Sequence, residues 1–112
     1  MENPHHTEHD TGEPSREEVD QMKGPVLLEF GAADCGFCLA LRPHLHALLK
    51  QFPQVRHLRI EDGKGKLLGR SFRVKLWPTL IFLRDGELIR QAVRPSPPEV
   101  REGLQAIAAE GA

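Results

Sequence analysis

Cys35 and Cys38 are the only cysteines of this 112-residue chain, and only Gly36 and Phe37 separate them. This spacing lets both sulfurs lie on the first turn of one helix, close enough to form a disulfide and to open it again. The apolar run at 26–30 comes just before the pair, and a stretch with helical periodicity follows it. A CxxC pair at such a strand-to-helix turn is typical of redox chemistry.

We expect the two cysteines to have different roles. At a helix N-terminus the unpaired N–H groups and the helix dipole favour a thiolate, so Cys35 should be the nucleophile. Cys38 lies one turn further in and should resolve a mixed disulfide by attacking Cys35. Asp34 opposes the first effect, because a neighbouring carboxylate disfavours a thiolate.

Two other interpretations of the cysteine pair stay open. The pair could be half of a zinc site, but such a site needs two more ligands. His44 and His46 lie two positions apart on a predicted helix and therefore point to different faces. The pair could also be inert. We predict redox chemistry, with no metal.

Composition bounds the other possibilities. The chain has the length of one domain, and 39% of its residues are hydrophobic, enough for one modest core. It has no 18-residue apolar span and no apolar signal segment near its start, so we expect a cytoplasmic protein that does not bind a membrane. Two cysteines are too few for a secreted disulfide scaffold.

Charge is divided unevenly along the chain. Residues 1–20 carry seven acidic residues and one basic residue, whereas residues 21–112 carry fourteen basic and nine acidic residues. Nucleic-acid binding would need a basic stripe with interleaved aromatic side chains. The chain has five Phe, one Trp and no Tyr, and these lie mostly in apolar runs. We therefore expect no nucleic-acid partner.

Local patterns predict a polar leader over 1–13 and one domain over 14–112. Ser15 with Glu18, and Ser96 with Glu99, form capping-box patterns that begin helices. Asp85-Gly86 is a strong hairpin signal. The predicted order is a helix to about Met22, strand 26–30, helix 36–52, strand 55–60, a short helix 66–72, strands 79–83 and 88–93, and a final helix after Ser96. Strands that alternate with helices imply a parallel pair, and the hairpin adds an antiparallel pair.

Over roughly residues 15–110 the chain resembles the thioredoxin family. The resemblance rests on the CxxC after the apolar strand, on Pro43 five residues beyond Cys38, and on Trp77-Pro78-Thr79 before the hairpin. It implies an α/β thioredoxin fold with a central mixed sheet of about four strands flanked by helices. It also implies that Pro78 is cis and faces the CxxC. The implied activity is exchange with protein disulfides by a monomer without a cofactor, restored by a reductase or another dithiol protein.

Several positions depart from the family pattern. The family usually has Trp before the first cysteine and Gly-Pro between the two, whereas this chain has Asp34 and Gly36-Phe37. The family's N-terminal edge strand has no apolar counterpart in 1–13, so we expect it to be absent or degenerate. The buried aspartate of the family corresponds to Glu29, and a nearby lysine falls at or beside His57.

The resemblance also implies roles for further residues. Glu29, with a pKa raised by partial burial, would accept the proton that Cys38 loses, although it could also be a strand-end Glu paired with Lys or reaching solvent. Gly36 and Phe37 would contact substrate. Trp77 would lie near Cys35 in an apolar docking patch, or simply pack in the core. Pro78 and Thr79 would leave backbone groups free to pair with an extended substrate segment.

We therefore predict a protein-disulfide reductase. The main alternative is a non-catalytic thioredoxin-fold chaperone or assembly factor that binds one partner. The intact CxxC argues against that alternative, because a pure binder does not need both thiols. A specialised oxidant or isomerase is a third possibility, which belongs to oxidising compartments.

Overall fold

The structure, a computed structural model, describes residues 13–109. The chain runs through α2 (Arg16–Asp20), β1 (Pro25–Gly31), α3 (Gly36–Leu49), β2 (Arg56–Glu61), α4 (Leu67–Ser71), β3 (Thr79–Arg84), β4 (Glu87–Val93) and α5 (Pro97–Ala108). The predicted order of helices and strands is confirmed. Among the residues described, no helix is long and apolar enough to span a bilayer.

The four strands form one mixed sheet in the order β2-β1-β3-β4. β1 pairs parallel with β2 and antiparallel with β3, and β3 pairs antiparallel with β4. The predicted α/β fold, with a mixed sheet flanked by helices, is confirmed. Between residue 13 and β1 the chain forms no strand, so β2 is an edge of this sheet.

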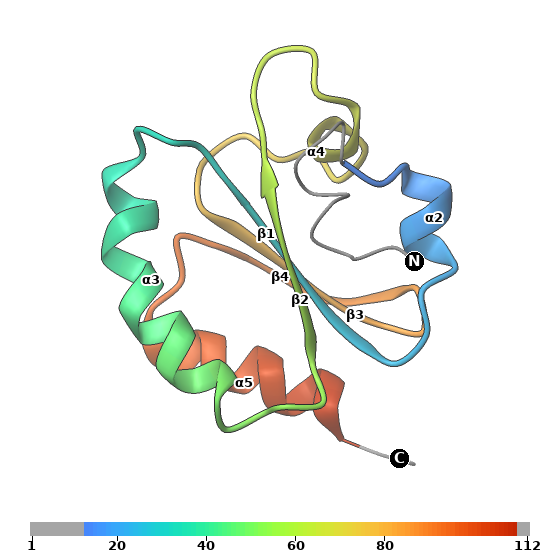
Figure 1. Cartoon of the computed structure of the whole chain (residues 1–112), viewed down its shortest axis with the longest axis vertical. Coiled ribbons are helices and arrows are strands. Elements are labelled where there is room, and N and C mark those ends of the chain that lie inside the picture. Colours follow the sequence, from blue (N-terminus) through green and yellow to red (C-terminus); the bar gives the residue numbers. More distant parts are fainter. Residues whose placement is uncertain (1–12, 110–112) are drawn as a thin grey trace, which may run out of the picture.

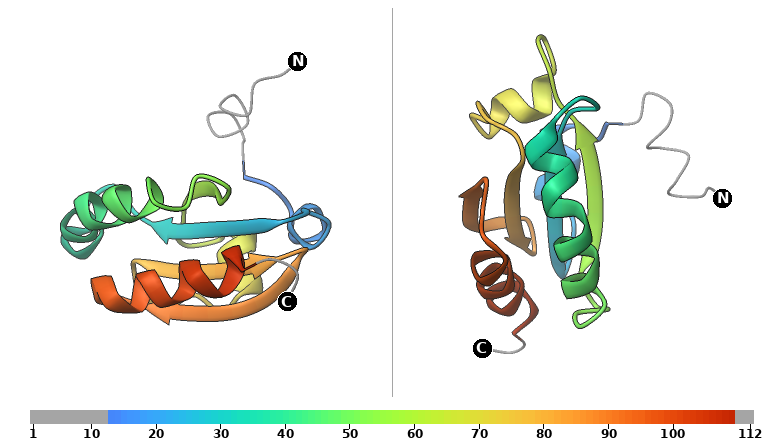
Figure 2. Two further views of the ribbon diagram at one scale, coloured as in Figure 1. Left: turned by 90° about the horizontal axis from the view of Figure 1, so that it is seen from below. Right: turned by 90° about the vertical axis from the view of Figure 1, so that its left-hand side faces the viewer.

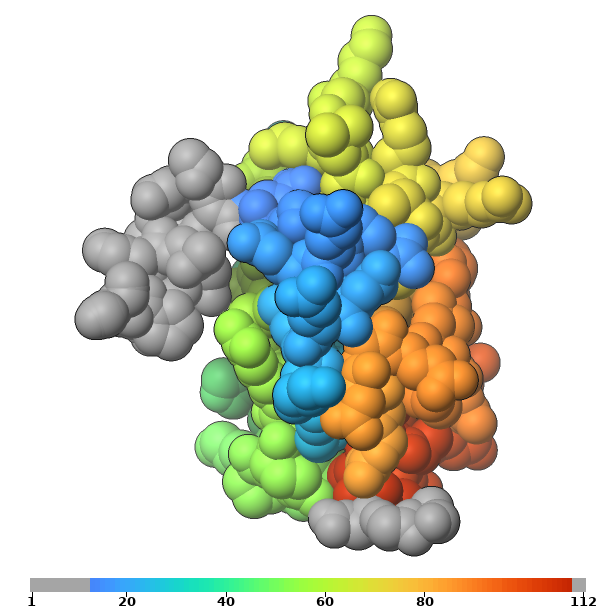
Figure 3. Space-filling model, turned by 90° about the vertical axis from the view of Figure 1, so that its right-hand side faces the viewer, coloured from blue at the N-terminus to red at the C-terminus, as the bar shows by residue number. Residues whose placement is uncertain are grey.

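Helices cover both faces of the sheet, which is seen nearly edge-on in Figure 1. α3 and α5 pack on one face, and Figure 2 shows them side by side. α2 and α4 pack on the other face. A guanidinium joins these two short helices: Arg16 donates to the carbonyl of Ser71 and stacks over the ring of Phe72. Figure 3 shows α2 on the surface beside the α4 segment.

Strand β1 explains why the central run of the sequence is continuously apolar. Successive side chains alternate between the faces of a strand. Leu27 belongs to the core under α3 and α5, while Val26, Leu28 and Phe30 belong to the core under α2 and α4. Glu29 shares the face of Leu27, because it lies two positions further along. The only acidic residue of β1 therefore points toward the layer that carries the cysteines.

Helix α3 ends at Leu49, so the prediction that it extends to residue 52 was wrong by three residues. The chain forms two short turns there: the Gln51 N–H donates to the Leu48 carbonyl, and the Phe52 N–H donates to the Leu49 carbonyl. Pro53 disfavours a helical conformation in the residue before it, which explains the early end. Phe52 stays half-buried against the core, so its apolar character was a correct signal of packing but not of helix.

The hairpin between β3 and β4 has the predicted Asp85-Gly86 turn, with φ values of 51° and 81°. This turn is joined to the segment before β1. Gly24 N–H donates to the Asp85 carboxylate at 2.8 Å, and Asp85 N–H donates to the Gly24 carbonyl at 3.0 Å. A side chain at Gly86 would collide with the carbonyl of Asp20, so the position requires glycine for space as well as for its backbone angles.

The division into a leader and a domain stays a prediction, because residues 1–12 lie outside the described part of the chain. Glu13 lies within it and contacts the domain: its Oε2 accepts the backbone N–H of Leu68, at the start of α4, at 3.2 Å.

Candidate active site

Cys35 and Cys38 lie where β1 gives way to α3, and they form a disulfide with their Cα atoms 5.2 Å apart. Cys35 is the N-cap of α3, and its sulfur accepts the backbone N–H of Cys38 at 3.1 Å. The two residues differ in access, since Cys35 is 9% exposed and Cys38 only 2%. The pair therefore consists of an outer sulfur that faces a helix N-terminus and an inner sulfur covered by protein.

Gly31 at the end of β1 makes room for the inner sulfur. A Cβ atom at this position would lie 3.0 Å from Cys38 Sγ, closer than side chains normally approach. Sequence reasoning missed this residue. The available signal was a glycine that directly follows an apolar strand and precedes the CxxC turn.

Glu29 is the buried acid below the disulfide, 1% exposed. His57 Nε2 lies 2.7 Å from Glu29 Oε1, and Arg59 Nε lies 3.5 Å from the same oxygen. The parallel register causes this contact, because β2 runs beside β1 with Arg59 opposite Glu29 and His57 opposite Leu27. The prediction that His57 lies beside Glu29 agrees with this geometry, while Arg59 was missed.

The pKa of Glu29 is lowered, contrary to our expectation of a raised value. Burial acts most strongly and would raise it. The hydrogen bond and charge of His57, together with the charge and hydrogen bond of Arg59, outweigh burial and bring the pKa below its ordinary value. Glu29 is therefore held as a carboxylate by its neighbours His57 and Arg59.

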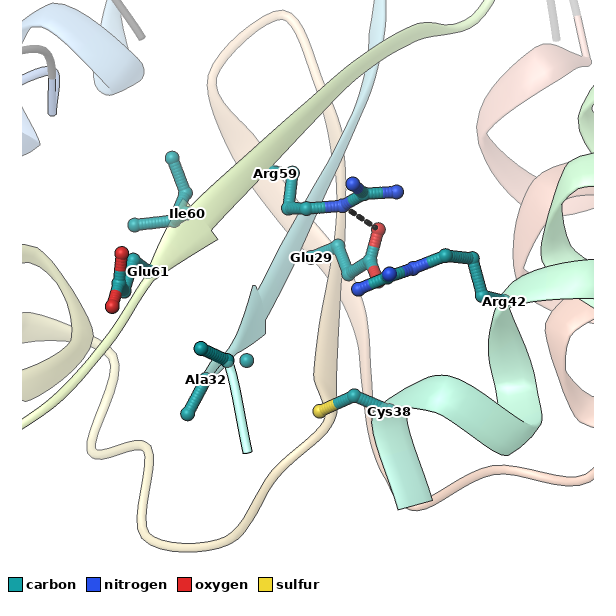
Figure 4. Close-up of a pocket in the computed structure, with 9 residues that line it drawn as sticks. Glu29, Ala32, Cys38, Arg42, Arg59, Ile60 and Glu61 are labelled. Atoms are coloured by element: carbon teal, nitrogen blue, oxygen red, sulfur yellow. Dashed lines mark ion pairs between the residues drawn. The ribbon is translucent and has the colours of Figure 1, made fainter. Parts of the chain in front are cut away.

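A pocket of about 320 Å³ joins Glu29 to the inner cysteine. Its lining includes Glu29, Cys38, Arg42, Arg59 and Glu61. Figure 4 shows Arg42 reaching from α3 toward the Glu29 carboxylate, with Arg59 on the other side. Arg42 Nε is buried and has no hydrogen-bond partner among the residues described. Sequence reasoning missed Arg42, although its position four residues after Cys38 places both on one helix face.

The Trp77–Pro78 peptide bond is cis, as the resemblance implied. Pro78 is buried, and together with Phe37 it lines an open groove of about 240 Å³ beside the CxxC turn. Phe37 is 58% exposed and so presents an apolar face to solvent. The structure thus brings the predicted contact residues Phe37 and Pro78 together, with the exposed Gly36 next to Phe37 in the turn.

Trp77 and Thr79, unlike Phe37 and Pro78, do not line this groove. The Trp77 indole is half-buried, and its Nε1 donates to Asp62 Oδ2 at 2.9 Å. Trp77 is not among the residues that line the groove with Phe37. Thr79 is fully buried, and its hydroxyl donates to the Leu76 carbonyl at 2.7 Å. Both residues support the chain that carries Pro78, and their predicted contact with substrate stays a prediction.

The arrangement combines the parts that disulfide exchange needs: an outer sulfur at a helix N-terminus, an inner sulfur within reach, and an apolar groove beside them. Within residues 13–109, no three His, Cys, Asp or Glu side chains lie close enough to hold a metal ion.

Comparisons with known proteins agree with this chemistry. A sequence model of the thioredoxin family matches residues 6–106. A thioredoxin H-type from Ricinus communis is 29% identical over 85 residues, which cover 76% of this chain and 72% of that protein. Mitochondrial thioredoxin-3 from Saccharomyces cerevisiae is 26% identical over 80 residues, covering 71% of this chain and 63% of the yeast protein.

Solved structures extend the likeness to the fold. The structure of thioredoxin 2 from Pseudomonas aeruginosa PAO1 in its reduced form is 47% identical in sequence and superposes with a TM-score of 0.76, covering 88% of this chain and 93% of that one. Since the family match spans most of the chain and the two cysteines stand at CxxC spacing in a closed pair, the chain belongs to the thioredoxin family and is a thiol–disulfide oxidoreductase.

Proposed function

We propose that the protein reduces disulfides of other proteins, with Cys35 as the attacking thiol and Cys38 as the resolving thiol. The observation that carries this proposal is the asymmetry of the pair. Cys35 is the more exposed of the two cysteines, and its sulfur accepts the backbone N–H of Cys38 in the first turn of α3. Both the hydrogen bond and the helix dipole favour the Cys35 thiolate.

The reaction starts from the dithiol. The Cys35 thiolate attacks one sulfur of a substrate disulfide, the substrate S–S bond breaks, and the released sulfur takes up a proton. A mixed disulfide now joins Cys35 to the substrate. Cys38 then loses its proton and attacks Cys35, which closes the Cys35–Cys38 disulfide and releases the second substrate thiol. Two electrons and two protons have moved to the substrate, and a reductase or another dithiol protein restores the pair.

Glu29 receives the proton of Cys38 in this scheme. Both residues line the same pocket, and Glu29 is held ionised, so its carboxylate can take up a proton. The 2.7 Å contact with His57 provides the next step. The His57 side chain is 26% exposed, so it connects the buried carboxylate to solvent. Glu29 is thus a general base, and His57 carries the proton outward.

Gly36, Phe37, Pro78 and the supporting Trp77 and Thr79 form the substrate side of the site in this proposal. The substrate lies in the groove beside Phe37. We place the activity in the cytoplasm, because the two cysteines form one exchange pair and leave none for a structural disulfide. We also propose that the protein acts as a monomer.

Insulin reduction tests the proposal. With a dithiol as electron source, the wild-type protein should turn over repeatedly, and Cys35→Ser should abolish turnover. The reduction potential of the pair should be about −270 mV, in the range of a reductase. Absence of turnover with any disulfide substrate, together with a stable complex that survives Cys35→Ser, would show instead that the protein acts as a binding factor.

A further inference from the structure

Arg94 contacts both segments that line the substrate groove, the one that carries Pro78 and the one that carries Phe37. It follows β4, and its backbone N–H donates to the Pro78 carbonyl at 2.9 Å. Its side-chain Nε donates to the Trp77 carbonyl at 2.8 Å. Its Cζ lies 3.9 Å from the centre of the Phe37 ring. One arginine therefore contacts both the cis-proline segment and Phe37, one of the two residues between the cysteines.

The backbone conformation of Arg94 is energetically unfavourable for a residue other than glycine. Its φ is 48°, in the left-handed region where glycine is favoured and other residues are disfavoured. An arginine in this conformation gains its contacts with Trp77 and Phe37, which a glycine would not make. The contacts fix the guanidinium at the groove that Phe37 and Pro78 line, beside the CxxC turn.

The outer part of this guanidinium is available to a partner. Nε is used by Trp77, while none of the ion pairs within residues 13–109 involves Arg94. Among the described residues, no acidic one lines the groove; its lining comprises Phe37, Ala40, Leu41, His44, Pro78, Arg94, Pro95 and Pro97. The terminal nitrogens of an arginine match the geometry of a carboxylate and bind it with two parallel hydrogen bonds.

Positive charge continues beyond Trp77. A second hollow of about 540 Å³ is lined by Asp62, the partner of the Trp77 indole and the one acidic residue that the described part of the chain contributes to it. Its basic lining residues are Lys64, Lys66, Arg70, Arg73 and Lys75. A surface of one charge sign steers partners of the opposite sign and disfavours partners of the same sign. This hollow and Arg94 therefore favour the same acidic partners.

We propose that Arg94 is a specificity-determining residue that selects substrates with Asp or Glu beside the disulfide-bonded cysteine. This inference rests on the proposed function, in which Cys35 attacks a protein disulfide. Arg94 takes no part in the covalent step. Its guanidinium binds the substrate carboxylate while Phe37 and Pro78 contact the neighbouring apolar atoms, so an acidic substrate is held with its sulfur near Cys35.

Three peptides that differ only in the residue before their cysteine test this selection. That residue is Glu, Gln or Lys, and each cysteine is joined by a disulfide to an aromatic thiol whose release is followed by absorbance. The Cys35 thiolate attacks the peptide sulfur, and the aromatic thiolate leaves. At low salt, wild type should react about fivefold faster with the Glu peptide than with the Lys peptide, the scale of one exposed ion pair.

The variants separate charge selection from structure. Arg94→Gln should bring the Glu and Lys rates together, and Arg94→Lys should keep part of the preference. Arg90→Gln is the matched control, because it removes an arginine charge from β4, the strand that precedes Arg94, at a position that pairs with Glu102 and does not line the groove. It should keep the wild-type preference.

Three results would overturn the inference: equal rates for the three peptides with wild type, a preference that survives Arg94→Gln, or one that disappears equally in Arg90→Gln. A uniform loss of all three rates in Arg94→Gln would also overturn it, because Arg94 would then only hold Phe37 in place. Failure of the proposed function looks different: all peptides would react as slowly as they do with Cys35→Ser.

Discussion

Replacing His57 by Ala should destabilise the protein through the acid that it leaves behind. His57 is the nearest partner of the buried Glu29 carboxylate, at 2.7 Å. Burial is the strongest influence on the pKa of Glu29, and without His57 only Arg59, at 3.5 Å on a half-exposed side chain, opposes it. The variant therefore keeps a desolvated carboxylate with one weak partner, and the pKa of Glu29 should rise.

The loss can be estimated from the contact. A hydrogen bond to a charged group contributes about 1.5–3 kcal/mol. Breaking a fully buried ion pair costs about 3–5 kcal/mol, but His57 is partly exposed, so the lower range applies. We expect a loss of about 2 kcal/mol, which corresponds to a fall in Tm of roughly 8–16 °C for a domain of this size.

The stability difference between wild type and His57→Ala should depend on pH in a defined direction. A carboxylate whose pKa is lowered in the folded state contributes stability above its unfolded pKa, and that stability is lost as pH falls through the folded pKa. The difference between wild type and His57→Ala should therefore be largest near neutral pH and should shrink below 4.5, the ordinary pKa of Glu.

Urea unfolding at neutral and acid pH measures this difference. His46→Ala is the control, because His46 is exposed on α3 and should change stability little at either pH. His57→Lys should recover part of the loss, since it places a cation beside Glu29. Equal stability of wild type and His57→Ala near neutral pH would refute the reasoning, and so would a loss that is as large in acid as at neutrality.

Three further substitutions test other parts of the site and fold. Gly31→Ala crowds Cys38 Sγ and should destabilise the disulfide form by about 1–3 kcal/mol, seen as a more oxidising reduction potential; an unchanged potential would contradict the contact. Arg42→Met removes the buried Nε, which has no hydrogen-bond partner within residues 13–109, so urea unfolding should show unchanged or higher stability; a large loss would show that the Arg42 side chain stabilises the Glu29 carboxylate. Ser96→Ala removes the capping box of α5 and should cost about 1 kcal/mol in thermal unfolding, with no effect on disulfide exchange.

Local signals in the sequence were sufficient for much of the fold. Both capping boxes form as predicted, and the Asp-Gly turn lies between the two strands expected. The CxxC pair stands at the strand-to-helix turn, and the WPT motif indicated the cis bond correctly. Each of these features depends on neighbouring residues, which is why a sequence pattern is enough to predict it.

Contacts between distant segments were harder to predict. The pKa of Glu29 depends on Arg59, which reaches it only through the register of two parallel strands. Arg94 stacks on Phe37 across 57 positions of sequence, and Trp77 turns to Asp62 instead of lining the groove. No local pattern encodes such pairings. They include the charges that surround the cysteines, and for this reason the reaction class was easier to predict than the specificity.

The difference between the two cysteines is the central claim, and covalent trapping tests it most directly. Reduced Cys38→Ser, which retains only Cys35, should accumulate a mixed disulfide with a protein disulfide substrate, visible by intact-protein mass spectrometry. Reduced Cys35→Ser, which retains only the covered Cys38, should accumulate almost none in the same time. If Cys35→Ser trapped the substrate as fast as Cys38→Ser, the assignment of Cys35 as the attacking thiol would be wrong.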